Sequence, residues 1–215
     1  MGSFVHLHVH SEFSLLDGLA RLSDLCEYAQ ESGMDALALT DHGQMYGMIK
    51  FYRAAKKAGI KPICGCEVYQ APRRLDQKEP QLDGKAYHLI LLAQNITGYR
   101  NLLQLVTTAN IDGFYYKPRI DKELLARHAE GLICLSACVS GEIPSLILGG
   151  QMDQARRAVG WFKEVFGPDR YFLELQRHKG IPELEQVNPK IVSLAKEFGL
   201  RCVATNDVHY VRQKD

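Results

Sequence analysis

The sequence predicts an α/β fold built on a largely parallel sheet, either closed as a barrel or left open. Short apolar runs rich in strand-forming residues alternate along the chain with segments of helical character. Several runs, such as "ALALT", "HLILLA" and "LICLSA", are apolar on both faces, which is typical of parallel strands covered on both sides. Gly33, Gly59, Gly131 and Gly199 stand where helices would end before the next strand.

The chain divides into seven expected strands and six expected helices. The strands are expected at residues 4–9, 36–40, 62–68, 87–92, 132–136, 171–175 and 202–205. The helices are expected near residues 21–32, 46–58, 97–109, 121–128, 151–166 and 183–198. Residues 70–85 have no apolar periodicity and contain several breakers, so we expect an exposed loop there.

The composition is that of an ordinary globular protein, with 46% hydrophobic and 24% charged residues. No apolar run approaches the roughly 20 residues that a membrane span needs, so we expect no membrane partner. The N-terminal stretch lacks the apolar centre of a signal peptide, which predicts a cytoplasmic protein. A net charge of +1 gives no general basic surface for nucleic acid, and six cysteines in that compartment are expected to be free thiols or metal ligands.

Residue types that bind metal ions gather where the expected strands end. His8 and His10 end the first strand, and Glu67 lies near the end of the third. The others are Asp41 and His42 after the second strand, Cys138 after the fifth, and Asp207 and His209 after the seventh. His88 is an exception, because it stands at the start of the fourth strand. The carboxyl ends of parallel strands meet on one face, so these side chains are expected to form one cluster.

This mixture of side chains suits the hydrolysis of phosphate esters. Imidazole binds zinc, manganese or iron, while carboxylates can bridge two cations and offset their charge. A bound divalent ion makes hydroxide available near neutral pH, and neighbouring ions can stabilise the attacking and leaving oxygens of a phosphate ester. No serine or cysteine nucleophile is then required.

Each motif has a plainer explanation when it is taken alone. His8 and His10 share one face of a strand by alternation, but they could be a solvated pair. Asp41 and His42, with the glycine after them, could simply form a turn. Taken singly, Glu67 could be a surface acid, His88 a core histidine, Cys138 a small buried side chain, and the Cys64-Gly65-Cys66 motif simple packing. The cluster as a whole is therefore the stronger indication.

The motifs together resemble a known family. "HLHVHSEFSLLDG", "LALTDHG", "GCEVY", "YHLILLA", "LSAC" and "ATNDVHY" are similar, in this order, to the PHP (polymerase and histidinol phosphatase) family. The connecting segments "GIKPICGCEVY", "GFYYKPRID" and "HAEGLICLSAC" resemble the branch found at the N-terminus of bacterial DNA polymerase III alpha subunits. The resemblance extends over essentially the whole chain and implies one PHP domain over residues 1–215, as the N-terminal fragment of a longer polymerase chain.

The resemblance implies a distorted seven-stranded β/α barrel of the TIM-barrel type, with three divalent metal ions at the carboxyl ends of its strands. Zinc is favoured, with manganese or iron as alternatives. The implied ligand sets are His8, His10 and Asp207 with a bridging Glu67; Glu67, His88 and Cys138; and Asp17, His42 and His209. Asp17 enters only through the resemblance, and the implied catalytic residues are His8, His10, Asp207 and His209.

The implied activity is a proofreading 3′–5′ exonuclease that hydrolyses the terminal phosphodiester of DNA with metal-bound hydroxide. Lys117 and Arg119, in "YYKPRI", and His178, in "QRHKG", are candidates to bind the DNA, although each could be an ordinary surface residue. Expected partners are the primer 3′ end, the rest of the polymerase alpha subunit and, within the replicase, a separate proofreading exonuclease subunit and a sliding clamp. The alternatives are a phosphatase for small phosphomonoesters and a non-catalytic domain stabilised by metals.

Overall fold

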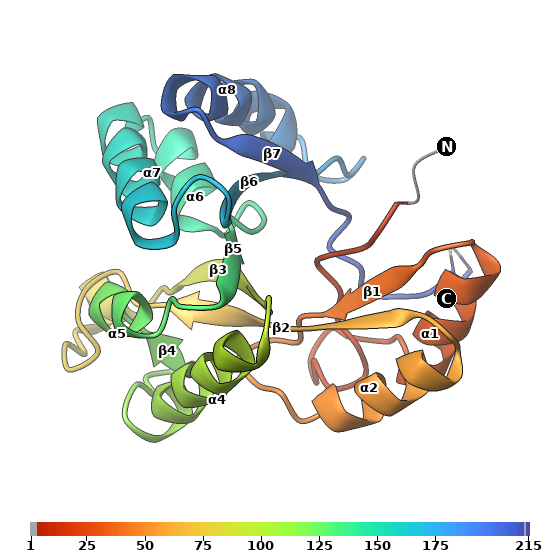
Figure 1. Cartoon of the computed structure of the whole chain (residues 1–215). Coiled ribbons are helices and arrows are strands. Elements are labelled where there is room, and N and C mark those ends of the chain that lie inside the picture. Colours follow the sequence, from red (N-terminus) through yellow and green to blue (C-terminus); the bar gives the residue numbers. More distant parts are fainter. Residues whose placement is uncertain (1–3, 213) are drawn as a thin grey trace.

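The computed structural model describes residues 4–212 and 214–215, so residues 1–3 and 213 of the expected domain lie outside the described part. Seven strands form one sheet that curls into a half-barrel (Figure 1). They are β1 (Ala36–Leu39), β2 (Lys61–Gln70), β3 (Tyr87–Ala93), β4 (Arg119–Ile120), β5 (Leu132–Leu135), β6 (Tyr171–Leu175) and β7 (Arg201–Ala204). The order is β1-β2-β3-β5-β6-β7, with β4 paired to β2. The expected distorted seven-stranded barrel is thus confirmed as an architecture.

Helices lie on the outside of the curl (Figure 1). They are α1 (Leu22–Glu31), α2 (Met48–Lys57), α3 (Pro80–Asp83), α4 (Ile96–Ile111), α5 (Lys122–Arg127), α6 (Glu142–Leu148), α7 (Met152–Phe166) and α8 (Glu183–Phe198). The six expected helices are present, and the sequence prediction missed α3 and α6, which have four and seven residues. Neither is long enough to show a clear helical period. Among the described helices, none combines the length and apolarity needed to cross a membrane.

The strands β1, β3 and β5 are buried on both faces, as their composition predicts, whereas β7 is largely exposed. Along β3, Leu89 and Leu91 face the large cluster under the helices, whereas Ile90 and Leu92 face a smaller cluster inside the curl. The inner cluster is completed by Ala38, Leu135 and Ala137. This packed interior fixes the strand ends, and therefore also the side chains that project from them.

The first expected strand is wrong as a regular strand. Residues 4–9 are extended beside β1, but the carbonyls of His6 and Val9 accept hydrogen bonds from Ala38 and Thr40, three residues apart instead of two. On its other side this segment meets the chain after β7, where His10 N–H donates to Val208 O and Val208 N–H donates to His8 O. The segment therefore lies between β1 and the chain after β7, where a further strand of the sheet would lie, but it forms no regular ladder of backbone hydrogen bonds.

The expectation of a parallel sheet is wrong for β3, which runs antiparallel to both β2 and β5. The connection from β2 to β3 contains only the short α3, and no helix long enough to carry the chain back as a crossover. The short strand β4, which the sequence prediction missed, pairs with β2 over two residues. The reversal of β3 changes which of its ends faces the functional site.

Candidate metal centre

All nine residues expected to bind metal lie at one edge of the sheet. His8 and His10 come from the N-terminal segment, Asp17 from the loop that follows it, and His42 from the residues after β1. Glu67 lies on β2, Cys138 follows β5, and Asp207 and His209 follow β7. His88 at the start of β3 lies at the same edge because that strand is antiparallel, with His88 opposite Tyr69 of β2. The one apparent exception in the sequence pattern is thereby explained.

Glu67 is the central carboxylate of the cluster. Its Oε1 lies 2.8 Å from His88 Nδ1 and 3.5 Å from His8 Nε2. Its Oε2 lies 2.7 Å from His42 Nδ1 and 3.2 Å from His10 Nε2. One side chain thus joins four imidazoles from three different segments of the chain.

Asp207 is a second meeting point. Its Oδ1 lies 3.1 Å from His8 Nε2, 3.3 Å from His10 Nε2 and 3.2 Å from His209 Nε2. The Asp207 backbone has a φ of 47°, a region that favours glycine, so the fold holds this residue in a strained conformation. Strain of this kind is common where a side chain must be aimed at a site.

Two further contacts complete the cluster at its outer side. Asp17 Oδ2 lies 3.1 Å from His42 Nε2, and Asp17 Oδ1 lies 3.8 Å from His209 Nδ1. Cys138 Sγ lies 3.7 Å from His88 Nδ1. The nine residues therefore form one continuous set of neighbouring ligand atoms.

The cluster has a buried floor and a more exposed rim. We call His8, His10 and Glu67 the floor, because their side chains are at most 1% exposed. The rim consists of Asp17, His42, His88, Cys138, Asp207 and His209, which are buried only in part. Asp17 has the most exposed side chain of the six rim residues, at 48%. A substrate can approach the rim, whereas the floor is shielded from water.

Several floor and rim atoms are close without being hydrogen-bonded. His8 Nε2, His10 Nε2, His42 Nδ1 and Glu67 Oε2 are buried and have no hydrogen-bond partner among the described residues. Unpaired buried polar atoms are costly, yet here four of them converge. A group of converging nitrogen and oxygen atoms of this kind is what a bound cation requires, so the residues fit a metal centre.

Three groups of three potential ligands have their ligand atoms within 4.8 Å of one another. They are His8, His10 and Asp207; His10, His42 and Glu67; and Glu67, His88 and Cys138. The first and last agree with two of the expected sets. The middle group differs from the expected set of Asp17, His42 and His209, which stays a prediction; His42 and His10 both lie close to the same oxygen of Glu67.

Comparison with known proteins shows the family. The PHP-domain profile matches residues 6–178, which is most of the chain. The chain belongs to the PHP family. The DNA polymerase III alpha subunits of Borreliella burgdorferi and Treponema pallidum are each 51% identical to it over 99% of the chain. The corresponding subunit of Thermus aquaticus is 48% identical over the whole chain. The chain spans only about a fifth of the length of these relatives, at 18% of each.

Solved structures share the fold of this PHP domain at low sequence identity. A putative metal-dependent phosphoesterase from Bifidobacterium adolescentis superposes with a TM-score of 0.60 at 13% identity, covering 97% of this chain and 88% of its own. An amidohydrolase from Chromobacterium violaceum superposes with a TM-score of 0.55 at 16% identity, covering 96% and 87%. At these identities the likeness establishes the architecture alone.

The electrostatics of the PHP domain prepare the ligand atoms for cations. Burial opposes ionisation of Glu67, but His8, His10 and His42 outweigh it and hold the Glu67 pKa well below its usual value. Burial likewise opposes ionisation of Asp207, and its imidazole neighbours lower the Asp207 pKa. Burial also disfavours protonation of His88, yet Cys138 and Glu67 raise the His88 pKa to about 9. Without metal, protons on the histidines balance the carboxylates.

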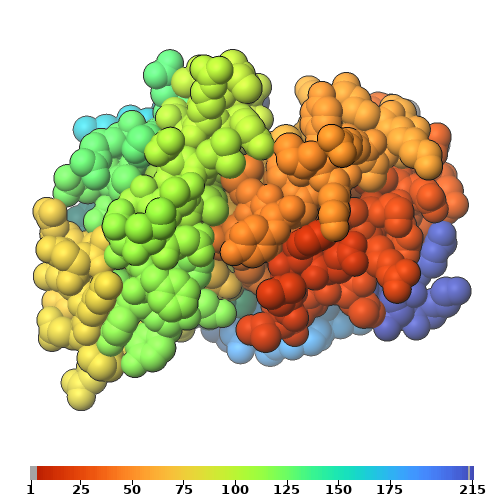
Figure 2. Space-filling model, turned by 90° about the horizontal axis from the view of Figure 1, so that it is seen from below, coloured from red at the N-terminus to blue at the C-terminus, as the bar shows by residue number. Residues whose placement is uncertain are grey.

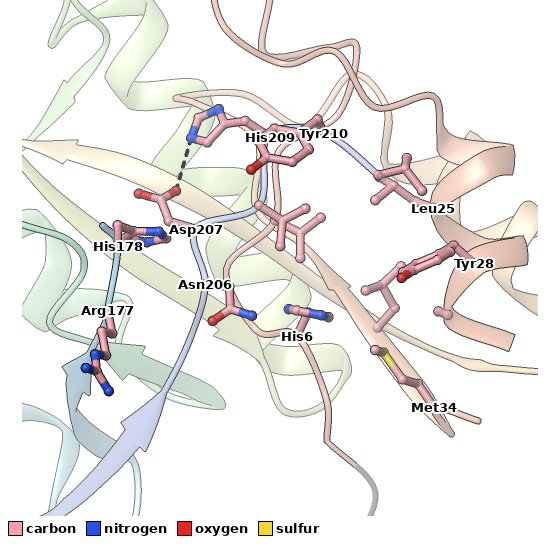
Figure 3. Close-up of a pocket in the computed structure, with 15 residues that line it drawn as sticks. His6, Leu25, Tyr28, Met34, Arg177, His178, Asn206, Asp207, His209 and Tyr210 are labelled. Atoms are coloured by element: carbon pink, nitrogen blue, oxygen red, sulfur yellow. Dashed lines mark hydrogen bonds and ion pairs between the residues drawn. The ribbon is translucent and has the colours of Figure 1, made fainter. Parts of the chain in front are cut away.

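The three residues expected to bind substrate have different positions in the PHP domain. Lys117 is exposed, and its Nζ lies 5.2 Å from the ring of Tyr69, which stacks beside His42. Lys117 can therefore reach the rim. His178 lies beside Asp207 on the wall of a cavity of about 430 Å³ (Figure 3). That cavity opens between the N-terminal segment, α1 and the chain after β7, and Arg177 and Tyr210 also line it.

The expectation that Arg119 binds DNA is wrong, because its side chain is not at the surface. Its side chain is fully buried, and its guanidinium donates to the backbone carbonyls of Gly113, Asp83, Leu75 and Gln77. Arg119 therefore fastens residues 75–83 to the strand β4. A buried arginine with its donors satisfied by carbonyl oxygens has a structural role.

Glu174 on β6 is the main site residue that the sequence reasoning missed. Its Oε1 lies 2.8 Å from His8 Nδ1, and both side chains are fully buried. Thr205 Oγ1 and Gln176 Nε2 also donate to this oxygen. A carboxylate on the far nitrogen of a metal-binding histidine orients the ring and fixes its tautomer. The available signal was one acid inside the apolar strand "YFLEL".

Proposed function

We propose that this PHP domain is a metal-dependent phosphoesterase, and that it acts as a 3′–5′ exonuclease on the primer end of DNA. The observation that carries the proposal is the convergence of unpaired buried ligand atoms from His8, His10, His42 and Glu67. Their contacts with Asp207 and the remaining rim residues provide room for more than one divalent ion. Zinc is our preferred metal, because imidazole and thiol ligands both suit it.

The net charge of the ligands and the bound ions would determine how strongly the centre attracts a phosphate. Divalent ions, when bound, would supply an activated water and would neutralise the charge of the phosphate. The carboxylates of Asp17, Glu67 and Asp207, with Cys138 as a thiolate, would offset only part of the charge of three such ions. The loaded centre would therefore remain attractive to an anionic phosphodiester.

Two residues outside the cluster would orient the DNA. Lys117, above Tyr69, would contact a backbone phosphate on one side of the rim. His178, whose Nε2 has no hydrogen-bond partner among the described residues, would contact it beside Asp207. Both contacts place the phosphate over the rim and leave the floor free of substrate.

The choice of DNA as substrate rests on the similarity to DNA polymerase III alpha subunits over almost the whole chain. We propose that the chain forms the N-terminal domain of such a subunit. The rest of the polymerase would then deliver the primer 3′ end, and a separate proofreading subunit and the sliding clamp would act in the same assembly. The net charge of +1 agrees with a domain that receives DNA from a neighbour.

The test uses a primer–template with a 3′ mismatch and protein reconstituted with zinc, manganese or iron. We expect stepwise removal of 3′ nucleotides, with no removal after chelation or in the Asp207→Asn variant. A matched arm measures hydrolysis of a simple phosphomonoester. Turnover of the phosphomonoester alone would favour a small-molecule phosphatase. Bound metal with no hydrolysis of either substrate would favour a non-catalytic domain and would overturn the exonuclease proposal.

A further inference from the structure

Asp41 is the one acid of the strand-end motifs that the metal cluster does not use. Its side chain is 2% exposed, and it is absent from the three groups of potential ligands. Its Oδ1 accepts from the backbone N–H of Ser11 at 2.7 Å and from Ser14 Oγ at 2.9 Å. Its Oδ2 accepts from Ser11 Oγ at 2.9 Å. A buried carboxylate with these partners holds the loop after the N-terminal segment and does not face a cation.

The hydroxyl of Ser14 connects Asp41 to the floor of the centre. Ser14 Oγ lies 3.0 Å from His10 Nδ1 and accepts from the backbone N–H of His42 at 3.2 Å. A hydroxyl has one proton and two lone pairs. Because the proton is donated to the carboxylate of Asp41, Ser14 can only accept from the histidine, so His10 must carry its proton on Nδ1.

On these contacts we propose that Asp41 and Ser14 form a positioning unit that sets His10 for metal binding, an inference that rests on the proposed metal centre. With the proton on Nδ1, the lone pair of His10 is on Nε2. That atom lies 3.2 Å from Glu67 Oε2 and 3.3 Å from Asp207 Oδ1, and it has no hydrogen-bond partner among the described residues. Asp41 thus acts through Ser14.

The same unit places Asp17 on the rim. The carbonyl of Ser14 accepts from the N–H groups of Asp17 at 3.1 Å and Gly18 at 2.8 Å, while Ser14 N–H donates to Ser11 O at 2.8 Å. Gly18 packs so closely that an added Cβ would lie 1.9 Å from Ser11 O. The loop therefore has one tight path from Ser11 to Asp17, and Ser14 stands at its centre.

The chain offers a matched pair of substitutions for the test. Ser11 and Ser14 are both buried, and each donates its hydroxyl proton to Asp41. Only Ser14 also contacts His10, whereas Ser11 Oγ accepts from the backbone N–H of Phe13. S14A and S11A each remove one buried hydroxyl from Asp41, but S14A alone releases the imidazole.

The experiment measures zinc affinity by competition with a chelator, and the tautomer of His10 from its ¹⁵N chemical shifts. We expect S14A to bind zinc about 10- to 100-fold more weakly, as is usual when the partner of a ligating histidine is lost. In the metal-free protein, at a pH where His10 is neutral, S14A should also lose the preference of His10 for the Nδ1–H tautomer. S11A should keep both the affinity and the tautomer. Comparable decreases in melting temperature in chelator would show that the two variants are equally well folded.

Equal zinc affinities for S14A and S11A, or an unchanged His10 tautomer in S14A, would overturn the positioning role. The unsubstituted chain provides a separate control. If it took up no zinc, the metal centre itself would fail, and both proposals with it. If it bound zinc but left DNA intact, only the exonuclease proposal would fail, because neither readout here depends on hydrolysis.

Discussion

The floor and the rim of the centre are held in place by different parts of the molecule. The floor residues His8 and His10 are braced from behind, one by the carboxylate of Glu174 and the other by the hydroxyl of Ser14. The rim residues Asp17 and His209 lie on loops, and they contact other rim residues at 3.1–3.8 Å. If the proposed metal centre forms, such a floor would set the positions of the cations, while a rim carried on loops would adjust to a substrate.

Removing the central carboxylate is expected to have the largest effect. Glu67→Ala leaves His8, His10, His42 and His88 facing a buried cavity without their shared anion. Loss of one partner of a buried charged set costs about 3–5 kcal/mol, so the melting temperature of the metal-free protein should fall. Metal content should fall to near zero, measured by elemental analysis after dialysis. Retention of all the bound metal would show that the floor does not organise the centre.

Removing the carboxylate charge of Glu174, which contacts His8, should have the next largest effect. Glu174→Gln keeps the size of the side chain but removes the charge that accepts from His8 Nδ1, Thr205 and Gln176. We expect zinc affinity to fall about 10- to 100-fold, as for other partners of ligating histidines. Competition with a chelator measures this directly. An unchanged affinity would mean that the packing around His8 orients the ring without the carboxylate.

A rim substitution should have a smaller and more selective effect. Asp17→Asn keeps the shape of a half-exposed side chain whose ion pairs, within the described part of the chain, are with His42 and His209. We expect loss of at most one bound ion and a change in unfolding free energy within about 0.5 kcal/mol, as at exposed sites. Elemental analysis and thermal unfolding measure the two quantities. Loss of all metal would contradict the division between floor and rim.

The same division decides what could be predicted from the sequence. Strand ends are encoded locally, so the pattern of apolar runs that end in, or are followed by, His, Asp, Glu or Cys located seven of the nine cluster residues, and His88 was noted as an exception at the start of a strand. Asp17 required family resemblance, because "LLDG" alone indicates only a turn. Glu174 was missed, since its partner His8 is 166 residues away and the acid in "YFLEL" alone does not name that partner. Local sequence patterns therefore predict residues at strand ends, but they do not predict which distant residues contact them.

The fold shows the same limit. Runs such as "HLILLA" predict a strand buried on both faces, but they do not state its direction, and β3 proved antiparallel. Arg119 in "YYKPRI" has the composition of a surface basic loop, yet the carbonyls of Leu75 and Gln77 that enclose it come from more than 40 positions earlier. Burial of a charged side chain depends on such distant acceptors. Composition alone therefore misplaces it.

The pH dependence of stability should differ between metal-free and metal-loaded protein. Without metal, the pKa of His88 rises from 6.5 to about 9, and those of His8, His10 and His209 are also raised. A raised histidine pKa gives stability that is complete below 6.5 and is lost as pH rises through the folded value. The melting temperature in chelator should therefore fall between about pH 6.5 and 9. With zinc it should not, because metal replaces those protons. The same dependence of melting temperature on pH with and without zinc would contradict this expectation.

The smallest effect is expected from a residue that touches neither floor nor rim ligands. Lys117→Ala removes an exposed cation above Tyr69 and leaves the cluster unchanged. Loss of one phosphate contact should raise KM for DNA several-fold and reduce its salt dependence by about one counterion, with kcat and metal content unchanged. Lys61→Ala is the control, because Lys61 is also exposed but begins β2, whereas Glu67 lies further along the same strand toward the centre. Equal effects of the two substitutions on KM would show that Lys117 contributes general charge and has no place beside the rim. A lower kcat for Lys117→Ala alone would instead extend the rim to include this lysine, because the contact would then matter most in the transition state.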